Sequence, residues 1–289
     1  MTVAVTGASG QLGQRVADLL LARLDPGDVV LLTRSVETLA ARAERGAAVR
    51  RADFDEPSSL VDALAGVDRM LLISALDLGR RAAQHRAAIE AAEAAGVRHV
   101  LYTSIPNPES GTAAAAPSHL ATEQALRDSG LAWTFLRNNL YAEFQVAVVA
   151  QAIESGRLVT SAGDGRTAYV SRDDCAASAA AVLVQDGHEG RAYDITGPDA
   201  IGSQELATLA TELGRRPVEV VQIDDDQLVA GMVEAGTPEF VARIVASFPA
   251  AAREGLLGSV SSAVEDLTGT PPRSLRDIVA ADLADTVQP

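Results

Sequence analysis

The chain has 289 residues, 47% of them hydrophobic and 3% aromatic, with a formal net charge of −15. This composition is typical of a soluble globular protein, and its acidity argues against nucleic acid or an anionic membrane surface as a partner, because both bind basic surfaces. The 24 residues counted as Lys or Arg are all Arg, which excludes Schiff-base chemistry and any reaction that needs a catalytic Lys.

In the first half of the chain, short apolar strands alternate with helical patterns of about 10–15 residues, as in βαβ units. The predicted strands are 2–6, 29–33, 48–53, 69–74, 98–104 and 131–137, and the predicted helices are 11–23, 35–45, one that opens at 57–59, 80–95 and 118–129. With a glycine turn after the first strand, this alternation predicts an α/β protein with a doubly wound parallel (Rossmann) sheet. The expected strand order is 3-2-1-4-5-6, with helices on both faces.

After about Leu140 the pattern is less regular. Residues 157–163, 166–171 and 191–197 read as short strands, and a strand near 193–197 could return to the edge of the main sheet. The chain from Asp225 onward reads as mostly helical, with expected breaks at Pro238, Pro249 and Pro271–Pro272. We therefore predict a Rossmann domain over 1–145, which includes the returning strand, and a smaller, discontinuous α/β lobe on the substrate side over 146–289.

Several kinds of site are excluded. Cys175 is the only cysteine, so no disulfide forms within the chain, and its apolar neighbours predict a small core residue. His99 and His188 have no partners at metal-ligand spacing, so we expect no metal. No signal peptide precedes the first predicted strand, and no apolar run could span a bilayer, which predicts a cytoplasmic protein.

The stretch TGASGQLG, residues 6–13, follows the first strand and opens the first helix. In such a turn, Gly7 permits a tight backbone, Gly10 lets a pyrophosphate approach the main chain, and Gly13 lets helix and strand pack closely. The N–H groups of the following helix then point at the phosphates. The spacing and its place in the βαβ array predict dinucleotide binding rather than a purely structural turn.

The end of the second strand, VVLLTRSVET, predicts which dinucleotide binds. Sites specific for NAD place an Asp or Glu there to accept from the ribose 2′-OH, but residues 33–36 contain no acid. They contain Arg34, followed by Ser35 as an expected helix N-cap, and a guanidinium beside a helix N-terminus suits a 2′-phosphate. The alternative is a solvated surface Arg, but the pattern favours NADP(H).

Two further strand ends face the expected cofactor. Asp53 and Phe54 end the third strand and could flank the adenine, although Phe54 could equally be a core residue. At the end of the fourth strand, small side chains would let the cofactor backbone pass, which adds Ser74, Ala75 and Leu76 to the predicted cofactor site.

Taken in order, TGASGQLG, LLTR, ADFDEPSSLVDALAGVD, QHRAAIEAAEAAGVRHVLYTS, HLATEQALRDSGLAWTFLRNNLY and AGDGRTAYVSRDDCAASAAA resemble the NmrA-like group of atypical short-chain dehydrogenase/reductases. Within that group the chain is most similar to the type 2 NAD(P)H:quinone oxidoreductases. The likeness covers nearly the whole chain and weakens after about Asp225. It implies a Rossmann domain that carries NADPH, a small lobe that closes over the nicotinamide, and either quinone reduction or, in inactive relatives, sensing of NADP.

The resemblance also implies roles for individual residues. The pyrophosphate would lie against Gly7, Ser9, Gly10, Gln11, Leu12 and Gly13, and the 2′-phosphate against Arg34. Thr103 and Ser104, which end the fifth strand, would face the nicotinamide ribose. Asn138, Asn139 and Tyr141, just after the sixth strand, would lie beside the nicotinamide. The implied substrate pocket contains Pro106, His119, Asn139 and Tyr141.

One departure from ordinary short-chain dehydrogenases concerns the catalytic pair. Those enzymes use Tyr-x-x-x-Lys on the helix after the fifth strand, whereas this helix reads HLATE, with His119 and Glu123 at the same spacing. Either the chain only senses its cofactor, or its reaction needs no dedicated proton donor. Quinone reduction fits the second, because the hydroquinone anion can take a proton from water. His119 could still donate a proton to the acceptor, or it could be a capping or ribose-contacting residue.

The leading hypothesis is an NADPH-dependent oxidoreductase that transfers a hydride to quinones or similar flat acceptors without a Tyr-x-x-x-Lys proton donor. The alternative is a non-catalytic NADP(H)-binding redox sensor or regulator of the NmrA type. A reductase or epimerase of a specialised metabolite is a third hypothesis. The expected partner is a small quinone-like molecule, and a homodimer is compatible with the sequence.

Overall fold

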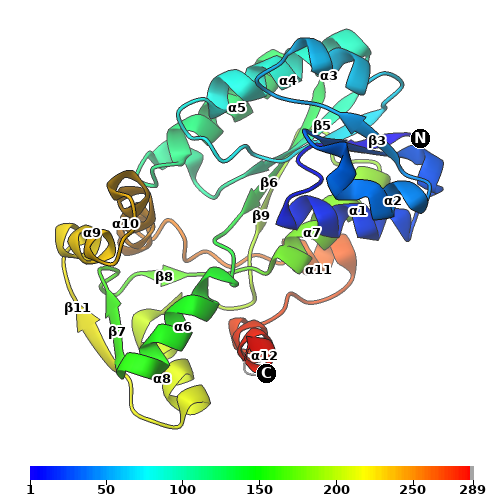
Figure 1. Ribbon diagram of the computed structural model, residues 1–289. Helices are drawn as coiled ribbons and strands as arrows, with labels where there is room; N and C mark the ends of the chain where they lie inside the picture. The colour runs from blue at the N-terminus through cyan, green and yellow to red at the C-terminus, as the bar shows by residue number, and fades with distance from the viewer. Residues whose placement is uncertain (287–289) are drawn as a thin grey trace.

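The structure is a computed structural model that describes residues 1–286 (Figure 1). Its main sheet contains β1 (Val3–Val5), β2 (Val29–Thr33), β3 (Ala48–Arg51), β4 (Arg69–Leu72), β5 (His99–Ser104), β6 (Ala132–Asn138) and β9 (Arg191–Ile195). These seven strands of residues 1–286 are all parallel, in the order β3-β2-β1-β4-β5-β6-β9. The predicted Rossmann order is confirmed. β9 adds a seventh strand beside β6, where the sequence suggested a returning strand.

Helices cover both faces of this sheet because successive strand side chains point to opposite sides. On one face Val3, Val5 and Leu31 pack against helices α1 (Gln11–Leu21), α7 (Arg172–Val184) and α11 (Ala263–Thr268). On the other face Ala4, Val30 and Leu32 pack against α3 (Ser58–Ala63), α4 (Arg81–Ala95) and α5 (Ala116–Asp128). Every residue of β1, β2, β4 and β5 is buried, which explains why most of their residues are apolar.

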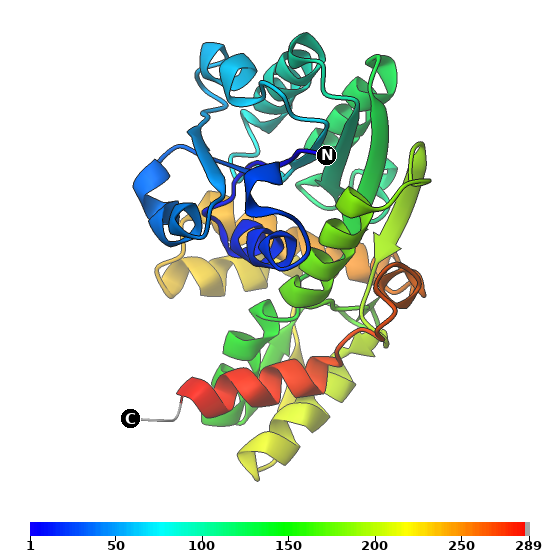
Figure 2. The same ribbon diagram turned by 90° about the vertical axis from the view of Figure 1, so that its right-hand side faces the viewer.

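A smaller lobe lies beyond the carboxyl ends of the strands. A separate core cluster holds together α6 (Phe144–Ser155), β7 (Arg157–Thr160), α8 (Ser203–Gly214), β11 (Glu219–Gln222) and α12 (Leu275–Thr286). Two short pairs complete it: β7 is parallel to β11, and β8 (Arg166–Thr167) is antiparallel to β10 (Ile201–Gly202). Figure 2 shows α12 lying across this lobe, below the Rossmann sheet.

Helices α9 (Asp225–Glu234) and α10 (Glu239–Arg253) form a hairpin beside the small lobe (Figure 1). The expected break at Pro249 is wrong, because this proline lies inside α10. The helix continues past the missing N–H since Ala251 and Ala252 are buried against Ala113 and Ala116 of the Rossmann part. The expected break at Pro238 is confirmed, because α9 ends at Glu234 and Pro238 is the N-cap of α10.

The structure refines two other expectations. Residues 35–45 form a 3-10 turn (Val36–Leu39) and a short helix α2 (Ala40–Glu44) rather than one helix, and Ser35 makes no side-chain cap bond. Because α7, β9 and α11 pack into the Rossmann core, residues after 146 contribute to both parts of the molecule. We therefore propose a Rossmann part that includes these three elements, and a lobe made of the remaining ones.

Two 3-10 turns, Pro26–Asp28 and Pro108–Ser110, lie in the loops before β2 and after β5. Within residues 1–286, no helix is long and apolar enough to cross a membrane. Cys175 is buried in the core, as expected, and burial raises the pKa of its thiol.

Candidate cofactor and acceptor site

The glycine turn connects β1 to α1, and the steric surroundings differ at each of its three glycines. Gly7 has a φ of 58°, which favours glycine. A Cβ on Gly13 would lie 2.3 Å from the Gly7 carbonyl oxygen and 2.7 Å from the Ala8 Cα, so helix and turn touch there without a side chain. A Cβ on Gly10 would meet only the Gly7 oxygen, at 3.2 Å. The turn is therefore open on the Gly10 side, where a phosphate could approach the backbone.

Beyond the turn, α1 offers its N-terminus to an anion. Gly10 is the N-cap and supplies no side-chain cap bond, and the first turn of α1 contains no acidic residue. The unsatisfied N–H groups at this end carry a partial positive charge that favours phosphate. Ser9 accepts a hydrogen bond from the Thr33 hydroxyl at 3.1 Å, which ties the turn to the end of β2.

Arg34 follows directly after β2 and is exposed. Its guanidinium makes no hydrogen bond or ion pair with any residue among 1–286. Residues 33–36 also contain no Asp or Glu that could bind the ribose 2′-OH of NAD. A guanidinium without a partner beside the glycine turn fits a bound 2′-phosphate. The residue roles predicted for the turn and for Arg34 stay predictions.

The ends of β3 and β4 contribute differently. Asp53 accepts a hydrogen bond from the Asp55 N–H at 3.0 Å, so one of its carboxylate oxygens stabilises the turn that follows β3. Phe54 is half-buried against the core with its ring edge-on to His85, which favours the alternative of core packing. After β4, Ser74 N–H donates to the Thr103 hydroxyl at 2.8 Å, which joins β4 to β5. Leu76 is 95% exposed.

The helix after β5 holds a buried ion cluster at the position of the missing Lys. Glu123 is fully buried and accepts from the Ser104 hydroxyl at 2.8 Å. The Arg137 guanidinium donates to both of its oxygens at 3.0 and 2.9 Å, and Arg127 donates at 3.1 Å. Glu123 is thus a structural anion that joins α5 to β5 and β6. The hydroxyl hydrogen of Ser104 is used in this hydrogen bond and is not free to bind a ligand.

His119 is buried, whereas a proton donor has to reach the bound acceptor. It is 3% exposed, and Arg81 Nη1 donates to its Nε2 at 2.9 Å. Because guanidinium has no acceptor atom, Nε2 is the unprotonated nitrogen, so Nδ1–H donates to the Tyr102 hydroxyl at 2.7 Å. Burial, reinforced by the Arg81 charge, lowers the pKa of His119 well below its usual value. Both ring nitrogens are occupied, which disfavours the predicted catalytic role.

A parallel network surrounds His85 between α4 and α5. The Ala75 N–H donates to His85 Nε2 at 3.0 Å, so the Nδ1–H donates to Thr122 at 2.9 Å. Burial lowers the pKa of His85 to about 3, so this histidine is neutral. These contacts make His85 a structural residue that supports the turn after β4.

The two asparagines at the end of β6 differ in their hydrogen bonds. Asn139 is committed to the backbone, donating to the Leu257 carbonyl at 2.9 Å and accepting from the Leu140 N–H at 2.8 Å. This disfavours its predicted contact with a substrate. The neighbouring Asn138 has a buried Oδ1 with no partner in residues 1–286, and an orphaned acceptor at this strand end fits a ligand donor.

Tyr141 and Pro106 lie close to the same edge of the sheet and are half-buried. The Arg172 guanidinium lies 4.6 Å from the centre of the Tyr141 ring and 4.9 Å from that of Phe144. Burial raises the pKa of Tyr141, which makes its hydroxyl a poor acid at neutral pH. Phe144 is 57% exposed and gives this edge an open aromatic face that the sequence analysis missed.

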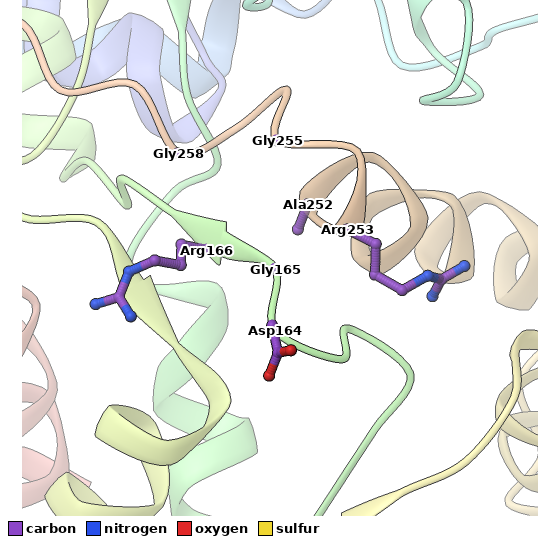
Figure 3. Close-up of a pocket in the computed structure, with 7 residues that line it drawn as sticks. All are labelled: Asp164, Gly165, Arg166, Ala252, Arg253, Gly255 and Gly258. Atoms are coloured by element: carbon purple, nitrogen blue, oxygen red, sulfur yellow. The ribbon is translucent and has the colours of Figure 1, made fainter.

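A hollow of about 510 Å³ lies elsewhere, between β8 and the end of α10 (Figure 3). The Arg166 and Arg253 side chains point away from each other there, and each guanidinium is already paired, with Glu205 and Asp225 respectively. Among the described residues 1–286, the lining of this hollow therefore offers no unpaired guanidinium to an anionic ligand. Among residues 1–286 no group of three or more His, Cys, Asp or Glu could hold a metal ion.

Comparison with known proteins decides the family. The family described as NAD(P)H-binding matches residues 7–186, more than half of the chain. The chain belongs to this NAD(P)H-binding family. It is 36% identical to quinone oxidoreductase 2 of Escherichia coli over 278 residues, covering 96% of this chain and 97% of the relative.

Solved structures of similar proteins agree with this assignment. An E. coli NADPH-dependent quinone oxidoreductase with bound NADPH superimposes with a TM-score of 0.94 at 35% identity, covering 98% of this chain and 100% of the other. A Citrobacter triphenylmethane reductase with NADP(H) gives a TM-score of 0.90 at 35% identity, covering 97% and 99%. The NmrA-like resemblance, the Rossmann fold and the NADP(H) cofactor class are confirmed, and the chain is an NAD(P)H-dependent oxidoreductase.

Proposed function

We propose that this protein uses NADPH to reduce quinones or similarly flat electron acceptors. The observation that carries the proposal is the glycine turn, which has free space beside Gly10, where a pyrophosphate would approach the backbone. The chain also matches quinone-reducing and dye-reducing relatives over almost its full length. The alternative hypothesis, a sensor that binds NADP(H) without turnover, is an outcome of the test below. The relatives favour the enzyme.

The residues that fit the cofactor are the glycine turn, the N-terminus of α1, Arg34 and the free Asn138 oxygen. The cofactor supplies the hydride when bound, so the protein's own contribution is to place two flat rings against each other and to exclude water. HLATE offers no side chain that could remove a proton from an alcohol, because His119 is neutral with both nitrogens engaged and Glu123 is held by two guanidinium groups. A quinone needs no such base, and its reduced oxygen can be protonated by water.

The test is NADPH oxidation followed by absorbance across a panel of quinones, beside NADP⁺ reduction with simple secondary alcohols. We expect steady turnover with quinones and none with alcohols. Robust alcohol oxidation would contradict the proposal. Tight NADPH binding without turnover of any acceptor would make the protein a regulator.

Cofactor preference depends on Arg34 in this proposal. We expect NADPH to bind about tenfold or more tightly than NADH, because a charge-assisted hydrogen bond contributes roughly 1.5–3 kcal/mol. Arg34→Ala should weaken NADPH binding by this factor and leave NADH binding almost unchanged, which titration of both cofactors measures. Arg23→Ala, which removes another exposed arginine that lies before β2 rather than after it, is the control. Equal losses for both cofactors would refute the assignment.

His119 provides a second check on the proton source. His119→Gln keeps an acceptor for Arg81 and a donor for Tyr102, so we expect kcat for quinone reduction to fall by less than about tenfold. General acid catalysis is typically worth about 10²–10⁴-fold. A loss within that range, at unchanged NADPH affinity, would instead identify His119 as the proton donor.

The remaining parts of the proposal come from the sequence. The net charge of −15 supports a protein without a nucleic-acid partner. We also propose a cytoplasmic location, and we keep the homodimer as a prediction to be checked by light scattering.

A further inference from the structure

Arg81 is a buried cation without a counter-charge. It is the first residue of α4 and 6% exposed. Its Nε donates to the Ala75 carbonyl at 2.6 Å, and its Nη1 donates to Ser118 at 3.2 Å and to His119 at 2.9 Å. All three acceptors are neutral, and no carboxylate of residues 1–286 lies within 4.0 Å of the guanidinium.

Two other arginines show what is unusual about this arrangement. Arg69, the second arginine in the buried class, pairs with Asp186. Arg80, the residue just before Arg81 in the chain, is exposed and pairs with both Asp55 and Asp77. A buried guanidinium without such a partner is costly to the folded protein, so it is expected only where another group supplies the negative charge.

The titratable side chains around Arg81 do not compensate its positive charge. The pKa values of His85 and His119 are lowered by burial and by Arg81 itself, so both are neutral. Burial raises the pKa of Tyr102, so its hydroxyl stays protonated. Burial also lowers the pKa of Arg81, but a guanidinium remains charged in proteins at neutral pH.

The turn that Arg81 supports lies beside the glycine turn. The Thr6 hydroxyl donates to the Leu71 carbonyl at 3.1 Å and accepts from the Ile73 N–H at 2.9 Å. A Cβ on Gly7 would lie 3.8 Å from Ile73. Two residues of extended chain, from Ile73 to Ala75, span at most about 7 Å. Arg81 therefore holds the turn that borders the crevice where the strand order reverses, the usual place of a dinucleotide.

We propose that Arg81 is a positioning residue for the cofactor: it fixes the turn after β4, and its uncompensated positive charge is balanced by the phosphates of bound NADPH. This inference rests on the proposed function, because it takes NADPH as the anion. Electrostatic interactions of buried groups are weakly screened by salt, so the charge can act without direct contact. In this arrangement the free protein carries an unfavourable charge that cofactor binding relieves.

The test separates the charge of Arg81 from its hydrogen bonds. NADPH affinity is measured by titration, without an acceptor, for the wild type, Arg81→Gln, Arg81→Lys and the matched control Arg80→Gln. We expect Arg81→Gln to bind NADPH at least about fivefold more weakly, Arg81→Lys to stay within about threefold of the wild type, and Arg80→Gln within about twofold. We also expect the melting temperature of the free Arg81→Gln protein to be unchanged or higher than that of the free wild type.

Equal losses in the Gln and Lys variants would overturn the inference, because they would make the contribution one of hydrogen bonding alone. Wild-type affinity in Arg81→Gln would also overturn it. If Arg81→Gln fails to fold, retained affinity in Arg81→Lys supports the proposal and lost affinity contradicts it. Wild-type NADPH binding without quinone turnover would refute the proposed function only, whereas turnover together with an unaffected Arg81→Gln would refute this inference only.

Discussion

Gly10→Val is expected to abolish measurable NADPH binding while the protein keeps its fold. Gly10 has a φ of −77°, an ordinary conformation for any residue, and a Cβ there meets only the Gly7 oxygen at 3.2 Å. The valine methyl groups would project from the open side of the turn, where the pyrophosphate is expected. We expect the affinity to fall by at least about a hundredfold, close to 3 kcal/mol. Titration measures the affinity and circular dichroism checks the fold.

Two other glycines serve as comparisons. A Cβ on Gly231 of α9 would meet no atom within 4 Å, so Gly231→Ala should leave NADPH affinity unchanged and, because Ala favours a helix more than Gly, should not lower stability. Gly13→Ala should instead destabilise the protein, since its Cβ would lie 2.3 Å from the Gly7 oxygen. A folded Gly10→Val that binds NADPH like the wild type would mean that the turn has only a structural role.

The elements that sequence predicts well are those determined by local pattern. The residues of β1 and β2 are buried on both faces, so their apolar runs are visible without any partner. Gly7 and Gly13 are required by the backbone geometry of the strand–helix turn itself. The prediction failed at Pro249, because the helix there is stabilised by contacts with Ala113 and Ala116, more than a hundred residues earlier.

Polar residues of the candidate site are harder to assign, because their partners are distant in sequence. His119 faces Arg81, 38 residues away, and the Asn139 amide reaches the Leu257 carbonyl, 118 residues away. A histidine in HLATE and an asparagine after β6 look available to a ligand until those partners are known. Arg81 was missed for the same reason, since a pair of arginines before a helix resembles a solvated helix start. What distinguishes Arg81 from Arg80 is its burial and its neutral partners, and the sequence shows neither.

Glu123→Leu is expected to lower the free energy of unfolding by about 3–5 kcal/mol, the usual cost of removing one partner from a buried ion pair. Glu123 is fully buried and accepts four hydrogen bonds, from Ser104, Arg127 and twice from Arg137. Leucine fills the volume but leaves the Arg137 guanidinium, only 18% exposed, without its main anion. Urea unfolding of the purified protein measures the change.

Glu109 provides the matched control, because it lies 3.9 Å from the same Arg137 guanidinium but is 61% exposed. Exposed ion pairs contribute roughly 0–1 kcal/mol, so Glu109→Gln should change stability by less than this. Glu123→Gln should fall between the two, since its amide oxygen still accepts from a guanidinium. If Glu123→Leu costs no more than Glu109→Gln, the cluster does not hold α5 against β5 and β6, and the acid at the Lys position of Tyr-x-x-x-Lys enzymes would need a role in the reaction rather than in the fold.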